Sequence, residues 1–315
     1  MMYPLLGGIF MGWSLGSNDA ANVFGTAVSS RMVRFRTAAL LASFFVILGA
    51  VVSGRAGIET LKGLTSFGIE EAVISSVAAA ITVTIMTVFG LPVSTSQSVV
   101  GSIIGIGILN GQLNYAGMGK VVACWFGTPI GAAAVSILLY KFFAYIYNRK
   151  KLSIFESDIV IRVGMTVAGS YGAYALGANN VANVTAVFVG AGLISVFNAA
   201  LIGGVSIALG IITYSRPVME TVGKKLVRLD PFSALIVVLS LGLTVHFFTV
   251  FGVPVSTSQG IIGGVLGVGL IKGVDTINRR TLYHILTGWF LTPFVACLFS
   301  IIINYVIHLQ YIPHQ

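Results

Sequence analysis

The stretch from Phe89 to Ile108, F-G-L-P-V-S-T-S-Q-S-V-V-G-S-I-I-G-I-G-I, is repeated from Phe251 to Leu270 as F-G-V-P-V-S-T-S-Q-G-I-I-G-G-V-L-G-V-G-L. Both copies contain the unbroken string P-V-S-T-S-Q, followed by three glycines at the same spacing. Chance does not produce agreement over this length, so the chain contains an internal duplication.

Two further pairs of strings extend the duplication. Gly16 to Asn22 reads G-S-N-D-A-A-N and Gly177 to Asn183 reads G-A-N-N-V-A-N, at an offset of 161 residues. The string W-F-G-T-P that begins at Trp125 corresponds to W-F-L-T-P, which begins at Trp289. The duplication therefore covers nearly the whole chain and predicts two repeats, at residues 1–150 and 151–315.

The composition is typical of a membrane protein. Of the 315 residues, 56% are hydrophobic and only 9% are charged, against roughly a quarter charged in an ordinary soluble domain. Apolar runs recur at about the 20-residue length that crosses a bilayer as a helix, for example Thr37–Gly54, Leu193–Ser215 and Leu282–Leu309. We therefore expect an all-α, multi-pass protein of the cell (plasma or inner) membrane.

Other features of the composition narrow the protein class. The first apolar run, Leu5 to Leu15, has no basic residue before it and no small-residue cleavage site after it, so a removable signal peptide is not expected. The formal charge of +9 would suggest nucleic-acid binding in a soluble chain, but here the basic residues are confined to short loops and act as topology signals. Cys124 and Cys297 lie in apolar segments that the duplication does not match, which indicates neither a disulfide framework nor a metal site.

Each P-V-S-T-S-Q string follows a long apolar leg and precedes a short one. After the first string only about a dozen residues, Ser98 to Asn110, precede the next turn, too few to span a bilayer. We interpret Glu70–Asn110 as a re-entrant hairpin with S-T-S-Q at its tip, and the second copy as another. Two full spans in each place are the alternative, because the first leg alone is long enough to cross.

Two helix interruptions are also predicted. The polar string Ser17–Asn22 has apolar flanks about half a membrane long, so we expect it at membrane depth, at a helix break. Lys120–Tyr147 is expected to be a long span that is interrupted at Gly127–Pro129.

The distribution of basic residues predicts an inverted topology. An odd number of crossings in each repeat inverts the second repeat relative to the first. With the N- and C-termini outside, fifteen of the 18 Lys and Arg residues fall in inner loops or near the inner ends of spans, and three fall outside. This asymmetry follows the positive-inside rule. Replacing each hairpin by two spans leaves the parity unchanged, so the count does not separate those alternatives.

An inverted repeat with polar strings at membrane depth is the architecture of a secondary transporter, whose site lies where the repeats meet. The S-T-S-Q strings offer hydroxyl and amide donors just before half-helices, whose N-termini carry unpaired N–H groups and partial positive charge. Together they predict an oxyanion site formed by Ser94, Thr95, Ser96, Gln97, Ser256, Thr257, Ser258 and Gln259. Interhelical hydrogen bonding alone is the alternative, but it does not explain two identical six-residue strings.

Asp19 is the one carboxylate of nine that this interpretation places at membrane depth. A buried ionised carboxylate is costly without a partner, and none of the four polar strings contains Lys or Arg. We infer a co-bound cation or proton, which favours symport. Amide oxygens are hard ligands that suit sodium, so the predicted sodium ligands are Asp19, Asn18, Asn22, Asn179, Asn180 and Asn183. The alternative is that these asparagines only cap a helix break.

At these motifs the sequence resembles the inorganic phosphate transporter (PiT) family of cation-coupled phosphate symporters. The family signature is G-x-N-D-x-x-N in each half, and Gly16–Asn22 fits it, while P-V-S-T-S-Q is similar to a second family element. The resemblance implies an inverted-repeat transport fold, phosphate at the centre, sodium or proton coupling, and a homodimer. The second signature departs from the pattern, because Asn180 stands where many members have Asp, and Asp19 is left as the single charged cation ligand.

The leading hypothesis is therefore a sodium-coupled phosphate importer that uses no cofactor. Proton coupling, or sulfate or another tetrahedral oxyanion as substrate, are alternatives, because the named donors do not distinguish them. An anion channel is disfavoured because no basic ring accompanies the polar strings. An enzyme is disfavoured because no H-E-x-x-H motif is present and neither repeated string contains His or Cys. His246 is expected to be a hydrogen-bonded buried histidine instead of a proton relay.

Overall fold

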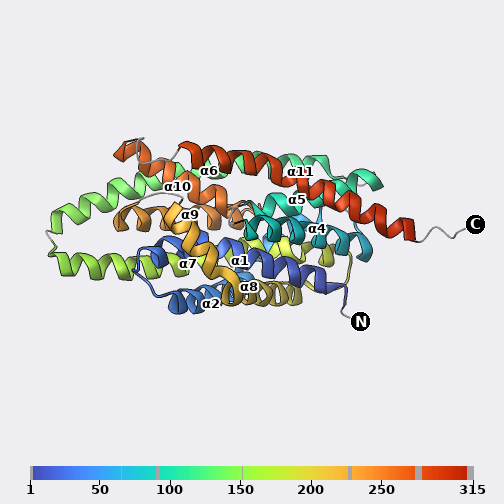
Figure 1. Cartoon of the computed structure of the whole chain (residues 1–315), viewed down its shortest axis with the longest axis horizontal. Helices are drawn as coiled ribbons and strands as arrows, with labels where there is room; N and C mark the ends of the chain where they lie inside the picture. The colour runs from blue at the N-terminus through green and yellow to red at the C-terminus, as the bar shows by residue number, and fades with distance from the viewer. Residues whose placement is uncertain are drawn as a thin grey trace, which may run out of the picture.

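The computed structural model describes residues 3–64, 66–89, 93–111, 113–150, 152–225, 229–273 and 279–310. All regular elements within these ranges are α-helices (Figure 1). They are α1 (Leu5–Ser29), α2 (Phe35–Ser53), α3 (Arg55–Lys62), α4 (Ile69–Val88), α5 (Thr95–Asn110), α6 (Tyr115–Lys150), α7 (Ile154–Gly190), α8 (Val196–Lys225), α9 (Pro231–Val250), α10 (Thr257–Lys272) and α11 (Arg279–Gln310). Seven of these helices are long and apolar enough to cross a membrane. The predicted all-α polytopic class is confirmed, and the chain is an integral membrane protein.

The segments predicted as re-entrant hairpins are two helix pairs that approach from opposite ends of the bundle. α4 and α5 occupy one end and α9 and α10 the other (Figure 1). α5 and α10 contain 16 residues each, about 24 Å at 1.5 Å per residue, which is shorter than a hydrocarbon core of about 30 Å. This arrangement supports the hairpin interpretation, which stays a prediction together with the inverted orientation of the repeats.

The helices of one repeat pack mainly on those of the other. α1 lies against α8 while its counterpart α7 lies against α2, and α5 lies against α11 while α10 lies against α6. Glycines permit the closest approaches: a Cβ atom on Gly16 would lie 2.0 Å from the carbonyl oxygen of Ile207, and one on Gly177 would lie 2.0 Å from that of Val46. Close backbone approach at small residues is the usual packing of helices in lipid, where no hydrophobic force joins them.

Both predicted interruptions are wrong. α1 passes through Ser17–Asn22 and α7 through Asn179–Asn183 as continuous helix, and α6 continues through Pro129. The backbone groups of α1 and α7 keep their helical partners, and the polar side chains bond with neighbouring helices, so no break is needed to satisfy them. The chain leaves the helical conformation instead just before α5 and α10.

The first turn of α1 and the last turn of α11 lie at the same end of the bundle (Figure 1). An inverted repeat with an odd number of crossings in each half places both ends of the chain on one side. The side that this end faces stays a prediction.

Candidate functional site

The two helix pairs meet through their tips, here defined as Val93–Gln97 and Val255–Gln259. The hydroxyl of Ser96 donates to the carbonyl oxygen of Val255 over 3.1 Å, and the hydroxyl of Ser258 donates to the carbonyl oxygen of Val93. Because the duplication matches these residues pairwise, the contact is reciprocal across the repeats. Each tip provides the acceptor that the other requires.

Ser94 and Ser256 begin the two short helices. Their side-chain oxygens accept hydrogen bonds from the backbone N–H groups of Gln97 and Gln259, over 3.2 and 3.3 Å. This is helix N-cap geometry. The hydrogen bonds between the tips hold the N-terminal ends of α5 and α10 near each other. Both macrodipoles therefore present partial positive charge to the same central region.

Asp19 lies at this centre and is fully buried. Its Oδ2 atom accepts three hydrogen bonds, from the hydroxyl of Thr95 over 2.8 Å, the hydroxyl of Thr257 over 3.1 Å and the amide of Asn180 over 2.9 Å. The donors come from α5, α10 and α7, so one carboxylate on α1 connects both tips and both long polar helices. None of the ion pairs within the described residues includes Asp19.

The asparagines of α7 connect the carboxylate to the tips. Asn180 Oδ1 accepts from Asn179 over 2.7 Å and from Asn183 over 3.1 Å. Asn179 also donates to the carbonyl oxygen of Val255 over 2.7 Å and accepts from its N–H over 2.9 Å, which holds the second tip at the backbone. Asn183 donates to the hydroxyl of Ser96 over 2.8 Å. These three amides thus position both tips.

The asparagines of α1 are placed differently. Asn22 donates to the hydroxyl of Thr257 over 3.2 Å, so it joins the central network. Asn18 donates to the hydroxyl of Thr87 on α4 over 2.9 Å. The structure therefore brings Asp19, Asn22, Asn179, Asn180 and Asn183 into one network with the tips, and Asn18 contacts α4.

Four buried oxygen atoms around the tips have no hydrogen-bond partner within the described part of the chain. They are Asp19 Oδ1, Asn183 Oδ1, Gln97 Oε1 and Gln259 Oε1. Buried polar atoms are paired in nearly all proteins, so unpaired ones indicate a water, an ion or a functional role. Carboxylate and amide oxygens are the ligands that hard cations prefer. These four atoms therefore have acceptor capacity that the hydrogen bonds between the described residues leave unused.

A cavity of about 670 Å³ lies next to the tips, between α6 and α11. Gln97 and Gln259 line it, and most of the remaining wall is apolar and includes Trp125 and Trp289. The indole Nε1 atoms of both tryptophans are buried and have no partner among the described residues. The repeated W-F-x-T-P string had marked these positions, but the sequence interpretation assigned them no role. Both tips therefore border this cavity through their glutamines.

His246 lies apart from the tips, on α9. Its Nδ1 atom is 2.8 Å from the hydroxyl of Tyr171, and its ring contacts the ring of Tyr174. The prediction of a hydrogen-bonded buried histidine is confirmed for the hydrogen bond, but the side chain is only partly buried.

Comparison with known proteins decides the class. A model of the phosphate transporter family matches residues 15–157 and 154–300 of the chain. The chain belongs to the phosphate transporter family. That family consists of membrane transport proteins, which agrees with the expectation that the chain is no enzyme.

Relatives of this phosphate transporter chain span nearly its full length. A protein of Methanocaldococcus jannaschii named "Putative phosphate permease" is 32% identical and covers 93% of either chain. A "Sulfate permease" of Bacillus subtilis is 29% identical over 93% of this chain and 84% of its own. A solved structure titled "The sodium-dependent phosphate transporter" is 25% identical, with a TM-score of 0.83, covering 97% of this chain and 98% of that one.

Proposed function

We propose that this protein imports inorganic phosphate by symport with sodium ions. The observation that carries the proposal is the environment of Asp19. A fully buried carboxylate receives three neutral hydrogen bonds and no basic partner within the described residues, and its Oδ1 atom has no partner. Uncompensated charge at membrane depth is costly, and a bound cation supplies the compensation.

In this proposal Asp19 and the amide oxygens beside it hold sodium. Asp19 Oδ1 and Asn183 Oδ1 are the oxygen atoms with unused acceptor capacity, and Asn180 and Asn179 set their positions through hydrogen bonds. Asn22 contributes through Thr257. Asn18, which contacts Thr87, would serve at the edge of the cation region.

Phosphate would bind where the N-terminal ends of α5 and α10 meet. Backbone N–H groups at helix N-termini are ready-made anion sites, and bound sodium would offset the charge of the nearby carboxylate. Thr95, Ser96, Thr257 and Ser258 place hydroxyl groups at this point, while Ser94 and Ser256 act as the helix caps. Gln97 and Gln259, the last residues of the tips, line the cavity of about 670 Å³ beside this point.

The two repeats, residues 1–150 and 151–315, would each contribute one tip and one polar helix to the transport site. The N- and C-termini would lie outside, and the protein would act in the cell membrane, where a homodimer is the proposed assembly. The solved structure titled as a sodium-dependent phosphate transporter supports sodium as the coupling ion.

The test is uptake of labelled phosphate by the purified protein in liposomes. We expect uptake under an imposed inward sodium gradient and much slower uptake under a proton gradient alone. Uptake that is unchanged when both gradients are collapsed would exclude symport. Faster uptake with the proton gradient would replace sodium by the proton as the coupling ion.

Sulfate is the second candidate substrate, because a relative named as a sulfate permease is 29% identical to this chain. Hydroxyl and N–H donors bind either tetrahedral anion. Competition separates them: if phosphate is the substrate, unlabelled phosphate reduces labelled phosphate uptake and the same concentration of sulfate does not. The reverse order of competition would make sulfate the cargo.

A further inference from the structure

A second cavity, with a more polar lining, lies where α1 ends and α2 begins. It has a volume of about 640 Å³, and its lining includes Arg31, Arg34, Arg216 and Glu220. Three guanidinium groups against one carboxylate give the lining a formal charge of +2. Neither Arg31 nor Arg34 forms an ion pair within the described part of the chain. The cavity therefore presents unbalanced positive charge.

The backbone at Arg31 is strained in a way that topology signalling does not require. Arg31 has φ of 60°, and no other non-glycine residue within the described ranges has a positive φ. The duplication matches it to Gly192, whose φ is 72° and which ends α7 in the same manner. A left-handed conformation is unfavourable for a non-glycine residue, because its Cβ atom comes too close to the following carbonyl oxygen. A basic residue placed elsewhere in the turn would mark the inner side equally well without that cost.

Neighbouring side chains hold the turn and the third arginine in place. Arg162 donates to the carbonyl oxygen of Met32 over 2.9 Å and is paired with Asp158. The Arg216 guanidinium lies 5.7 Å from the centre of the Phe35 ring, and its Nε atom is 3.0 Å from Glu220. The backbone of the turn and the Arg216 guanidinium are thus held in place, while the side chains of Arg31 and Arg34 are exposed.

The helix that begins at this cavity adds further anion affinity. Arg34 is the N-cap residue of α2, its backbone is extended, and no side chain caps the first-turn N–H groups. These groups and the positive end of the α2 macrodipole lie beside the three arginines. Backbone donors and guanidinium groups together form the usual surroundings of a bound phosphate group.

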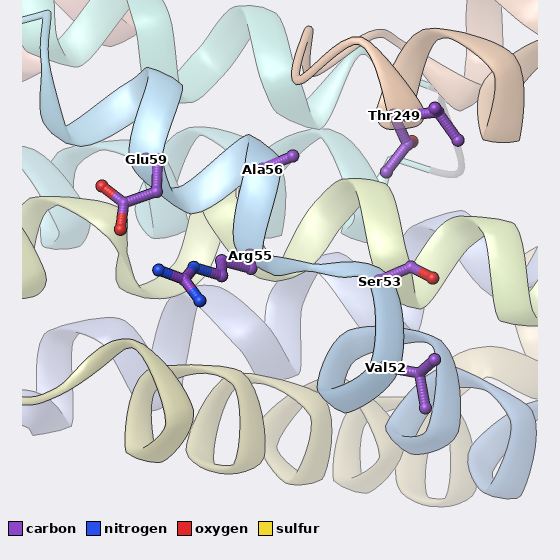
Figure 2. A pocket seen from close by; sticks show the side chains of 7 residues that line it. Val52, Ser53, Arg55, Ala56, Glu59 and Thr249 are labelled. Atoms are coloured by element: carbon purple, nitrogen blue, oxygen red, sulfur yellow. The ribbon is translucent and has the colours of Figure 1, made fainter.

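The residues that the duplication matches to this cavity provide an internal comparison. The duplication matches Arg216 and Glu220 to Arg55 and Glu59, which lie on one side of α3 and line a smaller cavity of about 420 Å³ (Figure 2). The turn residues that correspond to Arg31 and Arg34 are Gly192 and Ser195. An arginine followed four residues later by a glutamate is therefore common to both repeats, although Glu220 pairs with Arg216 and Glu59 pairs with Lys62. Of the turn residues compared, only those between α1 and α2 are basic.

We propose that Arg31, Arg34 and Arg216 form a binding site for a phosphate group, separate from the transport site. Basic pockets between membrane helices bind the phosphates of anionic lipid headgroups. A headgroup phosphate and free inorganic phosphate present the same oxygens to arginine. The proposal is independent of the transported substrate and of the coupling ion.

The test compares two double variants of the purified full-length protein in neutral detergent. Arg31→Gly with Arg34→Ser installs the turn residues of the second repeat, which are known to suit this backbone. Arg55→Gln with Lys62→Gln is the control, because it also removes two positive charges, but from α3. One arm measures bound phosphatidylglycerol by native mass spectrometry, with phosphatidylcholine as the comparison lipid, and the other measures labelled inorganic phosphate by equilibrium dialysis.

We expect Arg31→Gly with Arg34→Ser, the turn variant, to bind one of the two probes about tenfold or more weakly, because it loses charge-assisted bonds to phosphate. Arg55→Gln with Lys62→Gln, the α3 variant, should bind both probes as the parent does. Weaker binding of phosphatidylglycerol would identify a lipid headgroup as the ligand. Loss of one class of binding sites for inorganic phosphate would identify the free anion as the ligand. Arg216→Gln, which leaves the turn intact, should reproduce the loss. Equal binding of both probes by parent, turn variant and Arg216→Gln would overturn the proposal, as would equal losses in the turn and α3 variants.

Discussion

Thr95 and Thr257 occupy equivalent positions in the two repeats, and their hydroxyls donate to the same atom, Oδ2 of Asp19, over 2.8 and 3.1 Å. Hydrogen bonds to a charged acceptor are stronger than those between neutral groups. A single carboxylate on α1 therefore holds both tips at once. Any change in what Asp19 binds acts on both tips together, which links the proposed cation site to the proposed anion site.

Replacing Asp19 by Asn should abolish sodium-driven phosphate uptake. The amide has nearly the same shape but brings no charge to attract a cation, and it offers a donor where Thr95 and Thr257 also donate. Uptake into liposomes under a sodium gradient measures the loss. Glu70→Gln, at an exposed carboxylate at the start of α4, is the control and should transport as the parent does. Full sodium-driven uptake by Asp19→Asn would remove this carboxylate from the mechanism.

Thr95→Val and Thr257→Val should each slow phosphate uptake at low sodium by roughly 10- to 100-fold, the equivalent of one hydrogen bond to a charged group. Valine keeps the branched shape and removes the hydroxyl. The two losses should be similar in size because both hydroxyls bond with the same oxygen. Thr95→Ser and Thr257→Ser keep the donor and are the controls. If serine and valine variants transport alike at either position, the hydroxyl there has no role.

Gly101→Ala and Gly263→Ala should each lower the thermal stability of the protein. A Cβ atom at either position would lie 2.2 Å from a backbone carbonyl oxygen, that of Pro293 or Pro129 respectively, and overpacking of this kind costs about 1–3 kcal/mol. Gly119→Ala, where the added atom would meet nothing within 4 Å, is the matched control and should not destabilise. Unfolding followed by fluorescence in detergent measures the difference. Parental stability of both crowded variants would contradict the packing of α5 on α11 and of α10 on α6.

Exchanging the residues at the two matched left-handed positions should change stability in opposite directions. Arg31→Gly relieves the strained backbone and should stabilise the protein by about 1 kcal/mol, whereas Gly192→Arg introduces the strain and should destabilise it by a similar amount. No atom lies within 4 Å of a Cβ placed on Gly192, so the cost there is that of the backbone alone. Thermal unfolding of both variants is the measurement. A loss of stability in Arg31→Gly would mean that the arginine side chain contributes more than its backbone costs.

The repeated strings predicted which residues come together, because a duplicated chain builds its site where matching segments meet. They did not predict the partners. Asp19 and Thr257 are separated by most of the chain, and whether that threonine donates to a carboxylate or to a substrate depends on how the two repeats pack. The capping role of Ser94 and Ser256 was likewise hidden, since the same hydroxyls serve a cap or an anion equally well.

The predicted break at Ser17–Asn22 failed for a different physical reason. Polar residues within an apolar segment suggested a backbone released from helix, but their side chains are satisfied across helix contacts, as Asn22 is by Thr257. Small residues such as Gly16 let the backbone of α1 approach that of α8 while the helix stays continuous. Sequence periodicity does not distinguish a helix with an internal polar network from two half-helices. The sequence analysis did not predict the short helix α3 (Arg55–Lys62), because it is brief and polar.

Asn180 is the position at which the sequence departs from the family signature, and its contacts predict what the family residue would do here. Its amide donates to Asp19 Oδ2 over 2.9 Å, and its oxygen accepts from Asn179 and Asn183. Asn180→Asp would preserve the accepting side and place a second carboxylate within hydrogen-bond distance of the first. Two carboxylates this close cannot both be charged without compensation, so an additional cation or proton must bind.

We therefore expect the sodium dependence of phosphate uptake to become steeper in Asn180→Asp, with a larger Hill coefficient than in the parent. If a proton provides the compensation instead, uptake should fall as pH rises while the Hill coefficient stays constant. Titration of sodium at two pH values distinguishes these results, and Asn198→Asp, at an exposed position on α8, is the control for an added carboxylate. A sodium titration identical to that of the parent at both pH values would place Asn180 outside the cation site, because a second charge beside Asp19 cannot leave cation binding unaffected.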